Sequence, residues 1–224
     1  MGLSLGEEDE RFGCHEKYYE QAEESGDIHV IENVPEYPVK SMVDRFLNHG
    51  DENGPWKCEY AQVDPRLFGF STARPRVYGL AWNSNVVQWD PKFEFLEILE
   101  CLKESNLRDY LSNMSSKVRP GWQVADLCQL VRTGRARTDT VDNHLMTITT
   151  NSTRLYSKDK GRYMSSKELL SSHVFPVTQR HSKKVGSPML QIDTTEGKAA
   201  KMAGNSMNIP TMGAFVLAAV LGLS

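Results

Sequence analysis

The segment His29-Val30-Ile31-Glu32-Asn33-Val34-Pro35 contains the end of a short strand, with two polar side chains at that end. Its β-branched residues favour extended backbone, and Pro35 ends the strand because proline has no N–H to donate to a sheet ladder. Glu32 and Asn33 therefore belong to the carboxyl end of the strand. In open α/β sheets ligands bind at that end, so these two residues are the first candidates for a functional site.

Helices and strands alternate on both sides of this segment. Apolar periodicity of about 3.6 residues predicts the helices, and short runs of β-branched and aromatic residues predict the strands. The alternation predicts an α/β fold. The expected helices cover residues 12–25, ending before Gly26, then 39–48 and 93–111, and the expected further strands cover residues 58–63 and 77–82.

The second half of the chain has a different character. Residues 115–164 are rich in Ser, Thr, Arg and Gly and have weak periodicity, which indicates irregular or short-stranded structure. Ser165 and Glu168 have the spacing of a capping box, so a helix is expected to begin there. A final apolar helix is expected over residues 211–221, and no internal repeat is visible.

Composition places the chain among globular proteins but does not decide its partner. It has 224 residues, of which 39% are hydrophobic, enough for one large domain or for one domain with a smaller lobe. Residues 1–114 hold 11 Lys and Arg against 22 Asp and Glu, whereas residues 115–184 hold 13 against 5. The basic region is either a surface for a polyanion or a solvated face, and charge alone favours neither.

Several classes of protein are excluded by short patterns. The longest apolar run, residues 212–223, is shorter than the roughly 20 residues of a membrane span. Residues 7–10 are all acidic where a targeting signal is basic and apolar, so we expect an intracellular protein, nuclear in a eukaryote, that does not bind membranes. The cysteines contain no CxxC pair, so we expect reduced thiols and no metal site. They are Cys14, Cys58, Cys101 and Cys128.

Five groups of residues occur in a distinctive order along the chain. They are Gly2, Gly6, Asp9 and Arg11; Glu32-Asn33-Val34; Arg74 and Arg76 within residues 69–78; Arg162-Tyr163-Met164-Ser165 with Glu168 and Phe175-Pro176; and Gly204-Asn205-Ser206.

In this order the motifs resemble those of the cytosine-C5 DNA methyltransferase family. The resemblance implies an α/β fold with an incomplete Rossmann-like methyltransferase sheet and a small irregular target-recognition lobe. It divides the chain into a partial catalytic domain at residues 1–112, a basic lobe at 113–190, and a segment at 191–224 that returns to the catalytic domain.

The resemblance also implies roles for the motif residues. Glu32 would contact N3 and the exocyclic amine of a cytosine flipped out of the duplex, which activates the ring for attack by a thiolate and then by the methyl donor. Arg74 and Arg76 would hold the base, its phosphate and the neighbouring carboxylate. The alternative for Glu32 is a strand-end ion pair, and for the arginines a surface ion pair, with Arg76 mainly structural. Asn205 would brace the catalytic loop, and the Ser206 region would line the amino-acid end of S-adenosylmethionine.

The chain departs from the family pattern in ways that affect activity. Thr72 stands where the family usually has Gln, and Pro75 lies between the two arginines. The sequence contains neither a Gly-rich FxGxGG turn for S-adenosylmethionine nor a Pro-Cys dipeptide for nucleophilic attack. We therefore expect the chain to correspond to the carboxyl-terminal two-thirds of such an enzyme and to be inactive alone. The alternatives are a DNA-binding or partner subunit that completes a separate catalytic chain, and a non-functional gene fragment.

The basic lobe falls where the family keeps its target-recognition region. Its cations, interleaved with Tyr156 and Tyr163, suit contacts with the phosphates of duplex DNA, the expected partner. The alternative for each cation is a solvated side chain. The predicted DNA-binding residues are Arg132, Arg135, Arg137, Arg154, Lys158, Lys160 and Arg162.

Overall fold

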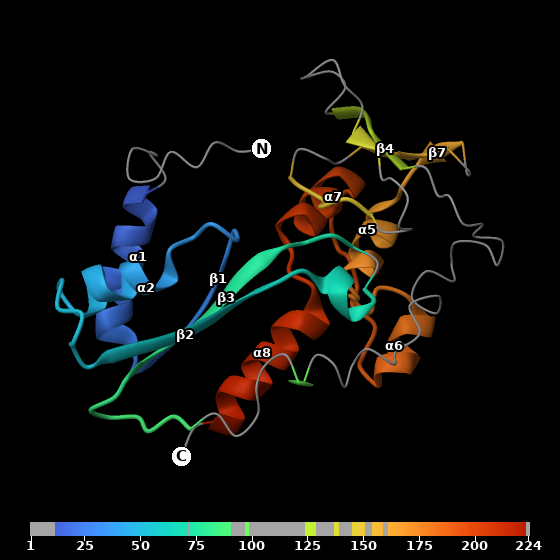
Figure 1. The fold of residues 1–224 in the computed structure, drawn as a ribbon. Coiled ribbons are helices and arrows are strands. Elements are labelled where there is room, and N and C mark those ends of the chain that lie inside the picture. The colour runs from blue at the N-terminus through green and yellow to red at the C-terminus, as the bar shows by residue number, and fades with distance from the viewer. Residues whose placement is uncertain are drawn as a thin grey trace. The chain divides into compact units, whose positions relative to one another are not determined.

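In this computed structural model the chain forms two compact units (Figure 1). The first unit comprises Met1–Val63, Pro75–Phe95 and Phe215–Ser224, and the second comprises Asp64–Arg74 and Leu96–Ala214. The three-part division expected from the sequence stays a prediction. The structure describes residues 12–70, 72–90, 97–98, 124–128, 137–138, 145–150, 154–158 and 161–222.

A three-stranded sheet forms the centre of the first unit. Its strands β1 (Ile28–Asn33), β2 (Trp56–Val63) and β3 (Arg76–Asn83) lie in the order β1-β3-β2, and β3 runs antiparallel to both neighbours. The two outer strands are consequently parallel to each other. All three strands were predicted from the sequence, and the expected α/β class is confirmed.

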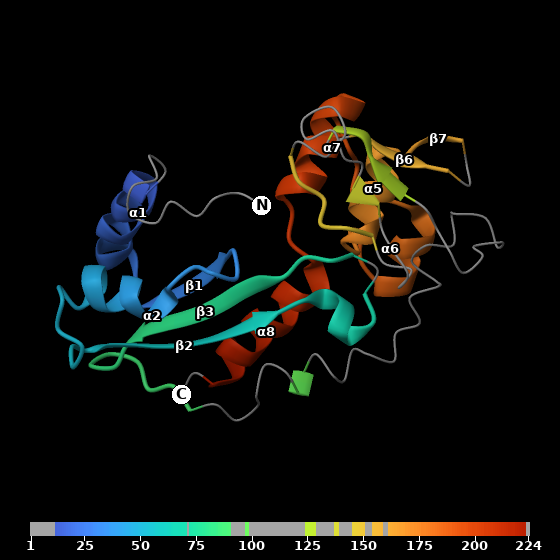
Figure 2. The ribbon, with the colours of Figure 1, turned by 45° about the horizontal axis from the view of Figure 1, so that its top comes forward.

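Both faces of this sheet are covered. Residues 77–82 of β3 are all buried, as expected for a central strand between two layers. On one face, Phe215 of helix α8 (Ile209–Gly222) contacts Tyr78 with ring centroids 5.7 Å apart. On the other lie α1 (Phe12–Ser25), α2 (Val39–Met42) and the π-helical turn η2 (Val43–Leu47), so the sheet lies between α8 and these helices (Figure 2). The buried residues on this second side include Tyr19, Ile31, Val39, Val43, Val77 and Ala81.

A glycine and an asparagine explain two local features of this unit. A Cβ atom on Gly79 would lie 2.8 Å from Val39 Cγ1, so glycine permits α2 to approach β3 closely. Asn48 ends the predicted helix over residues 39–48: its Nδ2 donates to the Trp56 carbonyl and its Oδ1 accepts from the Trp56 N–H, both at 2.9 Å. The Asn48 side chain thus makes the two hydrogen bonds to Trp56, the first residue of β2, that the backbone of a neighbouring strand would make.

The second unit contains short strands and helices. A four-stranded antiparallel sheet has the order β5-β4-β6-β7, which confirms the short-stranded structure expected in residues 115–164 for the parts of that range that the structure describes. Its core includes Val124, Ile148, Leu155, Leu169 and Ala203. The elements are η3 (Pro65–Phe68), β4 (Val124–Asp126), β5 (Arg137–Thr138), β6 (Leu155–Ser157), β7 (Arg162–Tyr163), α5 (Ser166–Ser172), α6 (Gln179–Val185), α7 (Glu196–Asn205) and the start of α8.

Two expectations about helices have different outcomes. The final helix predicted over residues 211–221 is confirmed as α8. The helix predicted over residues 93–111 lies outside the described residues, except for the helical pair 97–98. Within the described part of the chain, no single helix is long and apolar enough to cross a membrane; α7 and α8 together meet the length and composition test, with a bend of 44° between them.

Candidate functional site

Glu32 forms an ion pair at the carboxyl end of β1. Its Oε1 lies 3.0 Å from Nε of Arg76, the first residue of β3, and the two side chains are 20% and 16% exposed. This contact is an ion pair and not a hydrogen bond. The Oε1 atom is buried and accepts no hydrogen bond from the described residues. Arg76 also donates from Nη1 to the Pro75 carbonyl at 2.7 Å.

The strand register explains this pairing. Glu32 lies directly opposite Tyr78 in the antiparallel ladder between β1 and β3. Because side chains alternate along a strand, Arg76 lies on the same face as Tyr78 and is therefore a diagonal neighbour of Glu32. The strand-end ion pair considered as the alternative for Glu32 is present, and a catalytic role for Glu32 and Arg76 stays a prediction.

Arg74 is buried in the second unit and binds backbone carbonyl groups. Its side chain is 4% exposed, and its Nη1 donates to the carbonyls of Ile148 at 3.1 Å and Gly204 at 3.3 Å. A buried guanidinium needs such acceptors because desolvating an uncompensated charge is costly. The residue before it, Ala73, donates its N–H to the Leu145 carbonyl at 2.7 Å. Arg74 thus joins segment 145–150 to the end of α7, and its contact with a flipped base stays a prediction.

The departure at Thr72 also has a structural explanation. Thr72 is fully buried, and its hydroxyl donates to the Ser172 carbonyl at the end of α5, at 2.9 Å. It also forms an isolated parallel bridge with Leu145. A short hydroxyl side chain therefore anchors this segment where the family usually has Gln.

The Gly204-Asn205-Ser206 motif forms the end of α7. A Cβ atom on Gly204 would lie 2.5 Å from backbone atoms of Thr149 and Thr150, so only glycine permits this approach. Asn205 is exposed, whereas Ser206 is half-buried and donates from Oγ to the Ala203 carbonyl at 2.8 Å. The Arg74 and Gly204 motifs, far apart in sequence, therefore meet in one cluster.

The described residues do not form a complete site for S-adenosylmethionine. Ser206 uses its hydroxyl to close α7, and Asn205 contributes one exposed amide. The Gly-rich turn that would bind the nucleoside is absent from the sequence. The residues present therefore do not fit the whole cofactor, and cofactor binding at Asn205 and Ser206 stays a prediction.

The structure describes the surroundings of two of the four cysteines, Cys58 and Cys128. Burial raises the pKa of the Cys58 thiol, which opposes formation of the thiolate. Cys128 is half-buried, and its N–H donates to Asp126 Oδ1 at 3.0 Å. In the described parts of the chain, no group of His, Cys, Asp and Glu could hold a metal ion.

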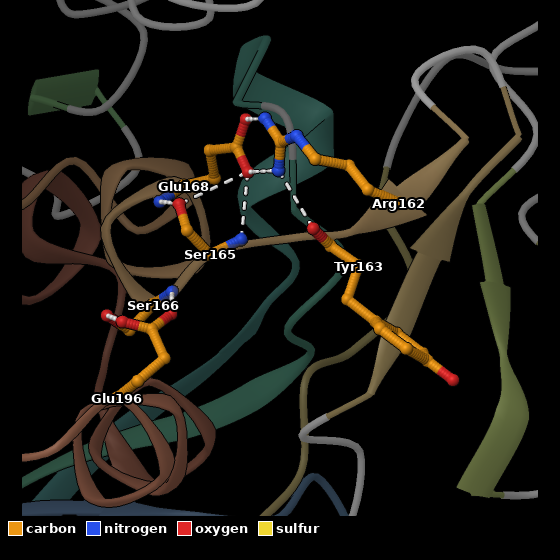
Figure 3. Close-up of polar contacts among 6 residues, drawn as sticks. All are labelled: Arg162, Tyr163, Ser165, Ser166, Glu168 and Glu196. Carbon is orange, nitrogen blue, oxygen red and sulfur yellow. Dashed lines mark hydrogen bonds and ion pairs between the residues drawn. The ribbon is translucent and has the colours of Figure 1, made fainter.

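The Arg162-to-Glu168 motif is a structural brace (Figure 3). Arg162 donates from both terminal nitrogens to the Glu168 carboxylate, at 2.8 and 2.9 Å, and also to the Tyr163 carbonyl at 2.8 Å. Glu168 accepts from the Ser165 N–H, and the Ser165 hydroxyl accepts from the Glu168 N–H, which confirms the predicted capping box. The Glu168 carboxylate raises the pKa of Arg162 above its ordinary value.

A second carboxylate extends this brace to another helix. Glu196, in the first turn of α7, accepts hydrogen bonds from the N–H of Ser166 and from the Ser166 hydroxyl, the latter at 2.8 Å (Figure 3). The starts of α5 and α7 are therefore tied together by side chains. No feature of the local sequence around Ser166 pointed to Glu196, because the contact joins residues 30 positions apart.

The predicted DNA-binding cations fall into three groups. Arg162 is paired with Glu168 and is 49% exposed. Arg154 and Lys158 flank β6 and are exposed. Arg132, Arg135 and Lys160 lie outside the described residues, and of Arg137 only the backbone, at the start of β5, is described.

Comparison with known proteins identifies the fold. No protein-family model matches the chain, and no curated protein matches it. Solved structures do match. The Dnmt2 methyltransferase of S. pombe has a TM-score of 0.54 and 17% identity over 87% of this chain and 67% of its own length. A DNMT2 mutant of Spodoptera frugiperda has a TM-score of 0.55 and 14% identity over 98% and 75%. The Entamoeba histolytica methyltransferase EhMeth has a TM-score of 0.57 and 18% identity over 95% and 68%.

The chain has a methyltransferase fold. This confirms the Rossmann-like α/β class expected from the motifs. At 14% to 18% identity the likeness is one of fold, so the roles of individual residues depend on the geometry described above.

Proposed function

We propose that the chain is the base-recognition part of a cytosine-C5 DNA methyltransferase, with Glu32 as the group that contacts the target cytosine. The observation that carries this proposal is the Glu32–Arg76 pair at the carboxyl end of β1. It combines a mostly buried carboxylate, an adjacent guanidinium and an Oε1 atom that accepts no hydrogen bond from the described residues. A cytosine presents N3 and an exocyclic amine that suit such a carboxyl group.

Arg76 is assigned a positioning role in this proposal. It fixes the Glu32 side chain across the ladder, while its own Nη1 is held by the Pro75 carbonyl. Arg74 stabilises the second unit by donating hydrogen bonds to backbone carbonyls, and its contact with a flipped base stays a prediction. The basic region supplies contacts with DNA phosphates, for which exposed Arg154 and Lys158 are suited.

The chain by itself is proposed to bind without catalysing methyl transfer. S-adenosylmethionine supplies the methyl group in this reaction class, and a thiolate must first attack C6 of the cytosine. The sequence has no Pro-Cys dipeptide, and burial raises the pKa of Cys58. Transfer of tritium from labelled S-adenosylmethionine to duplex DNA should therefore equal a no-protein control.

The Glu32 assignment is tested with a base that is easily extruded. A cytosine placed opposite an abasic site has a lower unstacking cost than a paired cytosine. Wild-type protein should bind this duplex more tightly than the same duplex with thymine at that position, and Glu32→Ala should remove the difference. The control Glu36→Ala changes an exposed carboxylate in the loop after β1 and should retain it. Equal preference in wild type and Glu32→Ala would contradict the assignment.

A second candidate function is that of a partner subunit for a chain that carries the cofactor site. The observation that favours it is the position of β1, which lies at an edge of the sheet formed by the described strands although it carries Glu32. The apolar helix α8 also exposes Val216, Leu217, Val220 and Leu221. A polypeptide that added a strand to β1 and covered α8 would complete an α/β sheet.

Complementation tests this second candidate. The S. pombe Dnmt2 segment that has no counterpart in this chain is expressed separately and mixed with the chain. Methyl transfer by the mixture would support the function of a partner subunit, provided that a Leu217→Glu/Val220→Glu variant that still folds abolishes the transfer. Absence of complex and of transfer leaves base recognition as the better-supported function.

A further inference from the structure

The hairpin of β6 and β7 presents two tyrosines on one face. Tyr156 pairs with Tyr163 in the antiparallel ladder, and Ser157 pairs with Arg162. Directly opposite residues share a face, so both tyrosines lie on one side and Arg162 lies on the other. The two rings meet edge to face, with centroids 5.7 Å apart and an interplanar angle of 80°. Tyr163 is 49% exposed and Tyr156 is half-buried.

The exposed Tyr163 ring projects from a firmly anchored strand. At the base of the hairpin, buried Met164 donates its N–H to the carbonyl of buried Leu155 at 2.8 Å. On the far face, Arg162 holds the Tyr163 carbonyl while it is paired with Glu168. The Tyr163 ring points away from this ion pair (Figure 3). The backbone that carries the ring is thus fixed on both sides, and the ring remains available for contact.

Two cations lie next to the ends of β6, on either side of Tyr156 in the sequence. Arg154 directly precedes Leu155, the first residue of β6, and Lys158 directly follows Ser157, the last. The Leu127 N–H donates to the Arg154 carbonyl at 3.4 Å, and the Gly161 N–H donates to the Lys158 carbonyl at 3.2 Å, so the backbone is held at both positions. Both Arg154 and Lys158 are exposed. We define the stacking face as Arg154, Tyr156, Lys158 and Tyr163.

We propose that the stacking face binds unpaired nucleotides of single-stranded DNA, with one base stacked on Tyr163 and phosphates near Arg154 and Lys158. The π-face of a base is covered by its neighbours in a duplex and becomes accessible only when the nucleotide is unstacked. Exposed aromatic rings with adjacent cations are the combination that binds such nucleotides without sequence preference. The inference rests on the proposed function, in that the second unit contacts DNA, and it adds the class of DNA that this face takes.

Anisotropy titrations on single-stranded and duplex DNA test the proposal. The probe is a fluorescein-labelled strand of about 12 nucleotides, free or annealed to its complement. Tyr163→Ala should weaken binding to the single strand by about 5- to 100-fold, and Tyr163→Phe should retain most of the affinity because the ring remains. Duplex affinity should stay the same in both variants. Tyr60→Ala is the matched control, because Tyr60 is 54% exposed on the edge strand β2 of the first unit.

The salt dependence separates stacking from charge. Arg154→Ala/Lys158→Ala should reduce the slope of log affinity against log salt on the single strand by about 1.4, at roughly 0.7 for each phosphate that is no longer neutralised. Tyr163→Ala should weaken binding without changing that slope. Unchanged circular dichroism and melting temperature establish that each variant folds.

Each outcome is decisive. The proposed stacking face is overturned if Tyr163→Ala binds the single strand as tightly as wild type does. It is also overturned if the substitution weakens binding to the single strand and to the duplex equally. In both cases, duplex binding by the wild-type protein still supports the proposed function. Wild-type protein that binds neither probe at low salt overturns both.

Discussion

The guanidinium of Arg74 donates a hydrogen bond to the backbone carbonyl of Gly204, at 3.3 Å, across 130 positions of sequence. The same Nη1 donates to the Ile148 carbonyl at 3.1 Å. Gly204 in turn packs against the backbone of Thr149 and Thr150, where a side chain does not fit. The Arg74 and Gly204 motifs, which suggested a catalytic function, therefore stabilise the second unit.

Replacement of Gly204 tests how much this close approach contributes. Gly204→Ala places a Cβ atom 2.5 Å from the backbone of Thr149 and Thr150, so the free energy of unfolding should fall by about 1–3 kcal/mol. Gly197, in the same helix α7, is the matched control because no atom lies within 4 Å of an added Cβ. Gly197→Ala should raise the free energy of unfolding by about 0.5–1 kcal/mol. Urea titrations measure both; similar effects of the two substitutions would contradict the packing at Gly204.

His29 should make stability depend on pH. It is 7% exposed and stacks on Trp56 with ring centroids 5.1 Å apart, and burial lowers its pKa below the ordinary value of 6.5. Tyr18 lies in edge-to-face contact with His29. The backbone of Gly26 and Ala22, and then the charge of Asp27, raise the pKa and oppose the effect of burial only in part.

The sign of the effect follows from proton linkage. The unfolded chain binds the His29 proton more readily than the folded chain, so the stabilisation is fully present above pH 6.5 and is lost as pH falls toward the lowered pKa. Urea midpoints between about pH 7 and pH 5 should decline more steeply for wild type than for His29→Phe, which keeps a ring against Trp56. Identical slopes would show that the pKa of His29 does not differ between the folded and the unfolded chain.

Several elements of the fold could be predicted because their signals are local in the sequence. Helix α1, strand β1 and helix α8 have clear apolar patterns and sharp ends. The capping box at Ser165 needed only two residues at a fixed spacing. By contrast, α7 has the sequence Glu-Gly-Lys-Ala-Ala-Lys-Met-Ala-Gly-Asn, in which small residues supply its buried side and give little apolar contrast.

The candidate site was predictable in its residues but not in its partners. Glu32 was singled out by its position after a β-branched run and before Pro35. Its pairing with Arg76 depends on an antiparallel register, whereas the alternation of helices and strands gave no information on strand direction. The acceptors of Arg74 are backbone carbonyls, which no side-chain motif specifies.

Substitutions of Glu168 should divide the brace into its two parts. Glu168→Ala removes both the capping interaction with Ser165 and the pair with Arg162, so the free energy of unfolding should fall by about 1–2 kcal/mol. Glu168→Gln keeps a capping side chain and loses the charge, and should cost about 0.5 kcal/mol because Arg162 is half-exposed. Thermal unfolding in low salt measures both. Equal losses in the two variants would show that the ion pair, and not the cap, dominates.

Duplex DNA binding tests the function of the basic region directly. Residues 115–184 hold 13 Lys and Arg against 5 Asp and Glu. We expect about three to five phosphate contacts, which correspond to a slope of log affinity against log salt of about −3 to −4.5. The dissociation constant should be micromolar at low salt, with little sequence preference.

Two variants measured on the same duplex distinguish phosphate contacts from base recognition. Arg135→Ala/Arg137→Ala should weaken binding and flatten the salt slope by about 1.8, because each phosphate that is no longer neutralised removes roughly 0.9. Glu32→Gln should change affinity little on a fully paired duplex, since extruding a paired cytosine costs a few kcal/mol and no thiolate traps it in this chain. Titrations at about 50 and 200 mM salt provide the slopes. If the wild-type chain has no measurable affinity at the lower salt concentration, the basic region is a solvated surface. A large loss of affinity in Glu32→Gln would place the Glu32 carboxylate in contact with paired DNA.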